Sequence, residues 1–403
     1  MGLTALISLL AMAALVVPAS DGRLIDTFVV AGAGLLALAA VAGSREHRTY
    51  RVALGRHWTA TILFAAFIGW GLFQLWSGPD AAAATARGRL SLLVFMALGL
   101  GALTMAAAAL RQGAIEAVDT VLGFGVAAGV GTLLLATLSE ATLAAPTGLA
   151  GVSVLAVFAG LEGYRRSQRH AAMAAEPPPI ARRLFLPGAA FTACAVALAA
   201  AQDVSAVLAS AAGISSLAAI AFWRARPAER RGVIALAAGA GGLGLVLFGL
   251  VRLLTGGEGA MGSGVSIGSA MALWELQPVT GIGLEGLSAQ AAGMDATAGA
   301  QLLVETGLLG AGLALATALA GFGFIVLTPD RDRVPSRAGA LCGGLLACAL
   351  CSALTSPALT QAAPAFVFAC LFGLSAAYGD RKRPSPAAAG PQSEPARVGM
   401  QRL

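Results

Sequence analysis

Charged residues are scarce in this sequence. Only 11% of the 403 residues are charged and 58% are hydrophobic, which gives a mean hydropathy of +0.81. A soluble globular protein carries about a quarter charged residues, so packing alone cannot hide this much apolar surface from water. The composition excludes a soluble globule and predicts a protein for which lipid is part of the solvent.

The sequence also lacks the patterns that hold metals or support nucleophilic catalysis. Its five cysteines lie inside apolar runs with no histidine nearby, and the one CxxC spacing, Cys348 to Cys351, stands within a long apolar run. Its three histidines form neither an HExxH motif nor a Ser-His-Asp arrangement. We therefore expect buried, unreactive thiols, no metal site and no cofactor.

Long apolar runs fill most of the chain instead. A transmembrane helix needs about 20 predominantly apolar residues, and such windows fall at residues 3–18, 25–43, 58–77, 89–110, 119–138, 146–162, 184–202, 204–223, 232–253, 299–327, 337–355 and 361–379. The pattern predicts an all-α polytopic membrane protein with about 12 transmembrane helices. Residues 1–379 form one transmembrane domain, and the Pro-, Ser- and Gly-rich residues 380–403 form a disordered cytoplasmic tail.

The basic residues are distributed unevenly between the two sides of such a bundle. With both termini in the cytoplasm, 22 of the 26 Lys and Arg residues fall on the cytoplasmic side, at 44–57, Arg111, 163–183, 224–231, 328–337 and 380–403. This is the asymmetry of the positive-inside rule. The net charge of +6 is therefore a topology signal rather than a sign of nucleic-acid binding, and we predict a multi-pass protein of the bacterial inner membrane.

Two longer connections interrupt the apolar runs. Segment 163–183 is basic and Pro-rich and predicts a cytoplasmic hinge between two halves. Segment 254–298 contains four acidic residues and no basic residue, and it predicts a large periplasmic loop between helices nine and ten. Within that loop, residues 262–275 predict a short amphipathic helix at the outer surface, ended by Pro278.

Charged side chains inside membrane spans are costly and are therefore candidates for function. Arg252 ends the ninth predicted span, and Glu305 lies in the tenth. Arg252 is either a substrate contact or a side chain that snorkels to the interface. Glu305 either acts at the site or is a buried carboxylate that a neighbouring helix hydrogen-bonds. An outward-facing site would be built from residues 252–305.

Gly281, Gly283 and Gly286 spell GxGxxG within the predicted periplasmic loop. A dinucleotide site requires a strand before this motif and a helix after it, but Pro278 and an extracytoplasmic loop precede it here. We interpret the glycines as positions of turn formation and close backbone packing.

Two segments resemble motifs of the O-antigen ligase and polymerase family. Residues 273–286, LWELQPVTGIGLEG, resemble that family's P-L-x-G-x-G turn, and residues 301–310, QLLVETGLLG, resemble its L-x-E-x-G-L-x-G helix start. The twelve-span topology, with its largest outer loop between spans nine and ten, is similar too.

The resemblance implies a role in surface-polysaccharide or exopolysaccharide assembly at the periplasmic face. The implied reaction is glycan transfer or polymerisation from an undecaprenyl-diphosphate-linked donor by a metal-independent membrane glycosyltransferase without cofactor. Its partners would be the bilayer, the lipid-linked glycan and other polysaccharide-assembly proteins, and no nucleic acid. The expected substrate-binding residues are Arg252, Trp274, Glu275, Gly281 and Gly283.

The chain departs from that family at its catalytic positions. The family has a histidine nine residues before the glutamate that matches Glu305, and this position is Ala296 here. The family's arginine ahead of the Pro-Gly turn has no counterpart, because residues 255–277 contain no Arg. Asp295 and Glu305 remain as catalytic candidates, with Asp295 as a substitute base.

Three functions therefore stay open. The first is a glycan ligase or polymerase. The second is a non-catalytic partner or lipid-glycan-binding member of the same fold, which the missing His and Arg favour. The third is a twelve-helix secondary transporter, which a basic central segment suits, although the acidic outer loop is unusual for that class.

Overall fold

The structure, a computed structural model, describes most of the apolar part of the chain. The described residues are 3–16, 30, 32–34, 58–77, 82–138, 146–171, 180–201, 203–224, 230, 233–234, 267–284, 287, 297–327, 337–356, 359 and 361–378. Among these residues every regular element is helical and no strand occurs, as the sequence predicts.

The helices follow the apolar runs. They are α1 (Leu3–Val16), α4 (Trp58–Ser77), α5 (Ala82–Gln112), α6 (Ala114–Leu138), α7 (Pro146–Ala171), α8 (Ile180–Ala200), α9 (Val204–Arg224), α11 (Ile267–Leu276), α13 (Ala298–Leu327), α14 (Arg337–Thr355) and α15 (Ala362–Tyr378). Within the described ranges, eight helices are long and apolar enough to cross a membrane, namely α4 to α9, α13 and α14. Helices α1 and α15 are also apolar. Because a helix rises only about 1.5 Å per residue, their described residues are shorter than a full span. The chain is a multi-pass α-helical membrane protein.

The helix bounds differ from the predicted spans mainly at polar ends. The predicted spans 25–43 and 232–253 lie largely outside the described residues. Helix α7 continues to Ala171 and α8 begins at Ile180, so both ends of segment 163–183, predicted as a hinge, are helical. A helix can leave the hydrocarbon region with its basic residues still in helical geometry, because long basic side chains reach the interface.

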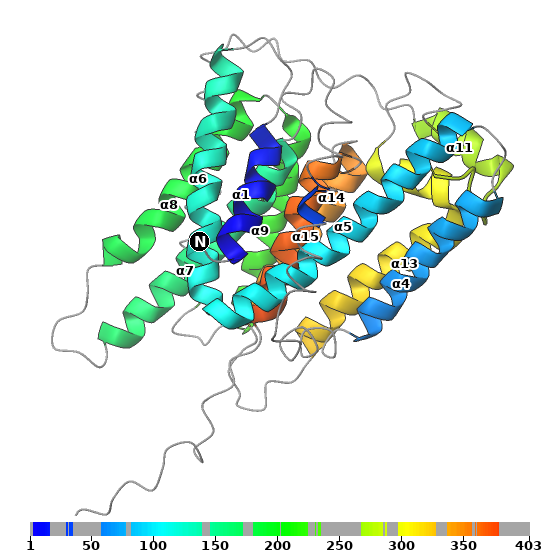
Figure 1. The fold of residues 1–403 in the computed structure, drawn as a ribbon. Coiled ribbons are helices and arrows are strands. Elements are labelled where there is room, and N and C mark those ends of the chain that lie inside the picture. The colour runs from blue at the N-terminus through cyan, green and yellow to red at the C-terminus, as the bar shows by residue number, and fades with distance from the viewer. Residues whose placement is uncertain are drawn as a thin grey trace, which may run out of the picture.

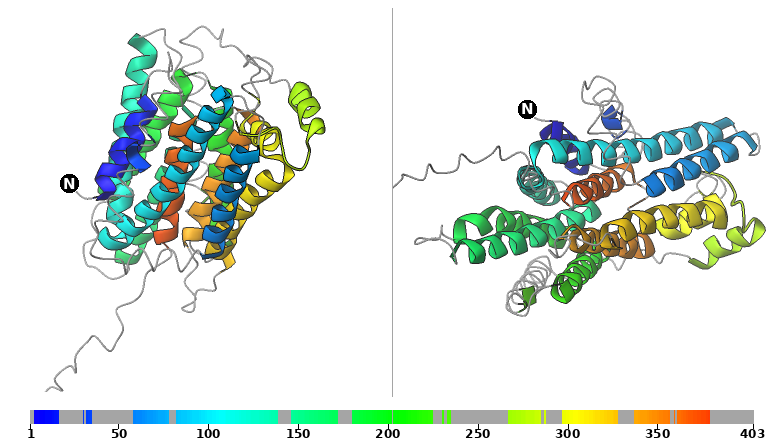
Figure 2. Two further views of the ribbon diagram at one scale, coloured as in Figure 1. Left: turned by 45° about the vertical axis from the view of Figure 1, so that its right-hand side comes forward. Right: turned by 90° about the horizontal axis from the view of Figure 1, so that it is seen from below.

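The helices pack as an elongated bundle. Figure 1 shows α4 and α13 side by side at one edge, α5 next to α4, and α6, α7 and α8 at the opposite edge. The further views in Figure 2 keep this arrangement and place α11 at one end of α13. Of the eight candidate spans, α7 is the most buried and α4 the least.

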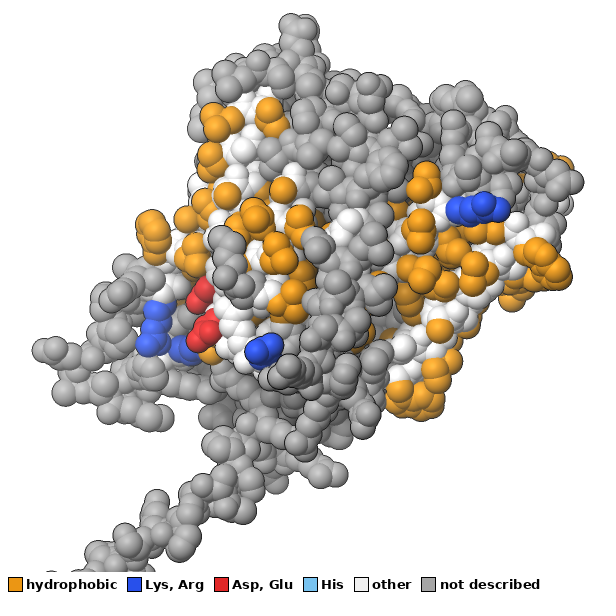
Figure 3. Space-filling model, viewed as in Figure 1, with side chains coloured by type: hydrophobic (Ala, Val, Ile, Leu, Met, Phe, Trp, Pro, Cys, Tyr) orange, Lys and Arg blue, Asp and Glu red, His pale blue; other side chains and the backbone are white. Residues whose placement is uncertain are grey.

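Apolar side chains cover much of the outside of this bundle. Figure 3 shows them along the visible faces of α4, α5 and α6, and Trp58, Ile62 and Leu134 are among the exposed ones. Exposing such an apolar surface to water would be unfavourable, whereas the hydrocarbon tails of lipids solvate it.

Small residues allow the buried helices to approach closely. A Cβ at Gly213 of α9 would lie 2.9 Å from the carbonyl oxygen of Gly344 on α14, and a Cβ at Gly344 would lie 2.9 Å from that of Gly213. Without a hydrophobic drive between helices in lipid, such backbone packing holds a membrane bundle together.

Candidate functional site

Helix α13 is interrupted at Gly307. This residue has φ 67° and ψ −174°, while the chain on both sides remains helical. A break of this kind removes helical hydrogen bonds, and backbone groups in a membrane must then find partners inside the protein.

The amide groups after the break are paired with residues 278–283, which we call the strap. The strap follows α11 and crosses α13 at the break. The amide of Leu308 donates to the carbonyl oxygen of Pro278 at 3.0 Å, and that of Leu309 donates to Val279 at 3.3 Å. The second half of α13 therefore begins with its exposed amides already bonded.

The carbonyl groups before the break are paired with the same strap. The amide of Ile282 donates to the carbonyl oxygen of Val304 at 3.0 Å, and the amide of Gly283 donates to that of Glu305 at 3.0 Å. The early residues of the strap thus accept hydrogen bonds from α13 after the break, and its later residues donate to α13 before the break.

Two side chains of α4 complete the pairing. The indole Nε1 of Trp70 donates to the carbonyl oxygen of Thr306 at 3.0 Å. The amide Nε2 of Gln74 donates to the carbonyl oxygens of Glu305 at 3.0 Å and Thr280 at 2.5 Å. Gln74 thus joins the strap to the broken helix, and both are held against α4.

The glycines of the motif have the roles that the sequence predicts for them. Gly281 and Gly283 have positive φ angles of 71° and 94°, which favour glycine. A Cβ at Gly281 would lie 2.5 Å from the amide nitrogen of Gly307, so only glycine fits there. The helix α11 precedes the turn, which a dinucleotide-binding turn does not allow. Gly286 lies outside the described residues.

Glu305 is buried, with 6% of its surface exposed. Its Oε1 accepts a hydrogen bond from Nε2 of Gln301 at 3.0 Å, and its main-chain oxygen is the one that Gly283 and Gln74 bond. Both the side chain and the backbone of Glu305 therefore hold the site together.

The other predicted binding residues lie in or before the strap. Trp274 on α11 donates from Nε1 to the carbonyl oxygen of Pro278 at 3.1 Å and packs against buried Leu287 and Val304. The neighbouring Glu275 is exposed. Helix α11 coincides with the second part of the predicted amphipathic helix and ends before Pro278.

Arg252 and Asp295 lie outside the described residues. The geometry therefore brings together Trp274, Gly281, Gly283 and Glu305, and it leaves the positions of Arg252 and Asp295 open. In the described part of the chain, no group of three His, Cys, Asp or Glu residues could hold a metal ion.

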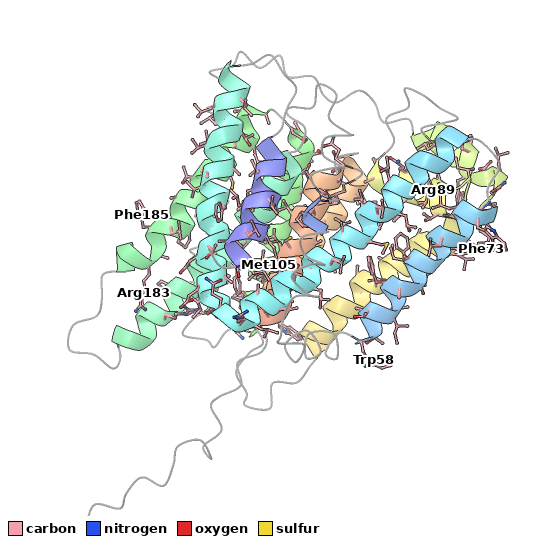
Figure 4. The ribbon with its side chains drawn as sticks, in the orientation of Figure 1. Trp58, Phe73, Arg89, Met105, Arg183 and Phe185 are labelled. Atoms are coloured by element: carbon pink, nitrogen blue, oxygen red, sulfur yellow. The ribbon has the colours of Figure 1, made fainter. Side chains whose placement is uncertain are left out.

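Sequence reasoning missed three residues around the strap. Gln74 and Trp70 fall within the predicted apolar span 58–77, although a glutamine within a membrane segment signals a structural or functional hydrogen bond. Arg89 on α5 is exposed, and it follows Gly88, where a Cβ would lie 3.3 Å from the carbonyl oxygen of Leu284. Figure 4 shows Arg89 at the end of α5 near α11.

A further buried charge lies at the other end of the bundle. Glu162 on α7 is 2% exposed, although only Arg252 and Glu305 were predicted as charged residues of the spans. Glu162 occupies the last position of the predicted span 146–162, where the sequence pattern does not distinguish a buried charge from an interfacial one.

The chain was also compared with known proteins. No protein-family model matches it, and a search of curated proteins gives no match.

Proposed function

We propose that this chain acts in surface-polysaccharide assembly, in the inner membrane of a bacterium. In this proposal twelve helices cross the bilayer, both termini are cytoplasmic, and residues 254–298 face the periplasm. The reaction is the transfer or polymerisation of a glycan from an undecaprenyl-diphosphate-linked donor. The uneven distribution of basic residues supports the orientation.

The contact between the two segments that resemble the ligase and polymerase motifs carries this proposal. Residues 301–310 contain the helix break, and residues 273–286 contain the strap that pairs with it. Segments that are separate in sequence thus form one structural unit at the end of the bundle where Arg89 lies. This supports reading them as one site.

The chemistry requires a cation and a base. The acceptor hydroxyl attacks the anomeric carbon of the donor sugar, the bond from that carbon to the diphosphate oxygen breaks, and the base takes the hydroxyl proton. Arg89 and Arg252 are the basic residues that this proposal assigns to the leaving diphosphate, because guanidinium groups bind phosphate oxygens bidentately. Asp295 would be the base, and Glu305 would position the strap.

A non-catalytic, lipid-glycan-binding role is the second candidate. The lack of an arginine in residues 255–277, where the family has one ahead of the Pro-Gly turn, favours it. Ala296, in place of the family's histidine, favours it as well.

The bonding of the helix break argues against a transporter. In many secondary transporters, the ends of a broken helix bind the substrate or the ion. Here the strap and α4 occupy the carbonyl groups of Val304, Glu305 and Thr306 and the amides of Leu308 and Leu309.

Purified protein in liposomes, supplied with lipid-linked glycan and acceptor, tests the proposal. We expect glycan product from the unaltered protein, loss of product in Arg252→Ala, partial loss in Arg252→Lys, and loss in Asp295→Asn. Full product from an Arg252→Ala and Asp295→Ala double variant would show that neither residue carries the chemistry. Binding of donor without any transfer would support the second candidate.

A further inference from the structure

Three arginines lie where α7 ends and α8 begins, at the end of the bundle opposite the strap. Arg165 and Arg166 are in the last turns of α7, and Arg183 is in the first turn of α8. Figure 4 shows Arg183 in the space between these two helices, and Figure 3 shows basic and acidic side chains gathered at this end.

Two carboxylates lie close to the arginines of α7. Glu162 is 3.5 Å from Arg165 and 3.9 Å from Arg166, and its side chain is almost completely buried. Arg166 also interacts electrostatically with Asp119 on α6. The side chain of Arg165 is only 12% exposed.

Two buried donors point to a ligand at this place. The hydroxyl of Ser167, whose residue is 2% exposed, and Nη1 of Arg183 have no hydrogen-bond partner in the described structure. Gly163 packs on the backbone of Arg183, with a Cβ position 3.3 Å from its carbonyl oxygen. Ser167 lies one helical turn beyond Gly163 on the same face of α7 and therefore also faces α8. Buried donors without acceptors are unfavourable, and an anion would satisfy both.

We propose that Ser167 and Arg183, with Arg166 beside them, bind the phosphate group of an anionic phospholipid. Ser167 ends one candidate membrane span and Arg183 begins the next, so the site lies at the depth of the head groups. Guanidinium groups match phosphate oxygens bidentately, and basic sites between transmembrane helices bind anionic lipids.

The neighbourhood of this site favours a lipid over free phosphate. Phe185, two residues after Arg183, is 75% exposed, and Figure 4 shows it on the outside of α8. An acyl chain attached to the bound phosphate could lie along this apolar face. Inorganic phosphate offers the same charge but gains nothing from Phe185.

Thermal unfolding of the full chain in phosphatidylcholine nanodiscs, with and without cardiolipin, tests the site. We expect cardiolipin to raise the unfolding temperature of the unaltered protein, and native mass spectrometry to find cardiolipin retained. Arg183→Gln should weaken the apparent affinity about tenfold, the equivalent of one lost charge-assisted hydrogen bond. Arg111→Gln, which removes an exposed arginine at the same end of the bundle, should leave the cardiolipin effect unchanged.

Ser167→Ala keeps the test valid if Arg183→Gln does not fold. This change removes a buried donor, so without cardiolipin we expect an unfolding temperature equal to or above that of the unaltered protein. With cardiolipin we expect a smaller rise in unfolding temperature than the unaltered protein shows. An undiminished cardiolipin effect in Ser167→Ala, or in a folded Arg183→Gln protein, would overturn the proposal. An equal stabilisation by inorganic phosphate at the same phosphate concentration would overturn the assignment to a lipid. These outcomes are independent of glycan transfer.

Discussion

Gly281 and Gly307 contact each other backbone to backbone. A Cβ at Gly281 would lie 2.5 Å from the amide nitrogen of Gly307, and a Cβ at Gly307 would lie 2.5 Å from that of Gly281. Both residues also have φ angles in the left-handed region. The strap and the broken helix can therefore meet only where both segments have a residue without a side chain.

Alanine at either glycine should destabilise the protein. We expect Gly281→Ala and Gly307→Ala each to cost at least about 2 kcal/mol, from the strained φ angle and the backbone clash together. Gly312→Ala is the matched control in the same helix, because nothing lies within 4 Å of its Cβ position. Thermal unfolding in detergent measures all three, and equal stability of the three variants would contradict the strap contact. The double variant should cost less than the sum, since both changes remove one contact.

The transmembrane helices were predictable because each one follows a local property of the sequence. Segment 58–77, for example, coincides with α4, since an apolar run of this length fixes a helix in lipid. The strap could be predicted only in part. The glycine spacing indicated a tight turn, but nothing local shows that Gly281 meets Gly307 or that Gln74 reaches them from α4.

The burial of Glu162 could not be predicted from the sequence for the same reason. Sequence position places it at the end of a span, where a charge normally reaches the interface. Only the packing of α7 in the middle of the bundle makes it buried. Interactions across helices, rather than along one, are what the sequence pattern leaves undetermined.

Replacing Gln74 should loosen the strap. Gln74→Leu keeps the side-chain size but leaves the carbonyl oxygen of Thr280 without the amide that bonds it, and we expect a loss of about 1–3 kcal/mol in stability. Gln74→Glu should lower the stability further, since a carboxylate cannot donate hydrogen bonds to the two carbonyl groups. The exposed Gln277 provides the control, and Gln277→Leu should unfold at the temperature of the unaltered protein. Normal stability of Gln74→Leu would mean that its hydrogen bonds contribute little.

Glu305→Gln separates positioning from chemistry. A glutamine oxygen at this place can still accept the hydrogen bond from Gln301, so we expect stability and glycan product close to those of the unaltered protein. Glu305→Ala removes the acceptor and should lower stability by about 1 kcal/mol or more. Loss of product in a stable Glu305→Gln protein would assign the carboxylate a chemical role and contradict a purely positioning one.

Cysteine labelling in intact cells tests the orientation. Gln277 and Gln112 are both exposed, and the proposed topology places Gln277 in the periplasm and Gln112 in the cytoplasm. A membrane-impermeant thiol reagent should label Gln277→Cys directly and Gln112→Cys only after permeabilisation. The parent protein is the background control, with four of its five cysteines buried. The reverse labelling pattern would mean that the orientation is inverted.

Arg89 is the residue at which the proposed glycan transfer can be tested without disturbing the fold. It is exposed on α5, on the same side as the exposed Leu93 and Met96, so a lipid-linked diphosphate could reach it from the bilayer. Arg89→Gln should therefore leave the unfolding temperature unchanged and reduce glycan transfer at least about tenfold, because each lost charge-assisted bond to phosphate is worth roughly that factor. The rate of glycan transfer by Arg89→Lys should fall between those of the unaltered protein and Arg89→Gln, since lysine keeps the charge but loses the bidentate geometry. Arg111→Gln, an equal loss of charge at the opposite end of α5, should transfer normally. Undiminished transfer by Arg89→Gln would remove Arg89 from the proposed site and leave Arg252 as the residue for the diphosphate.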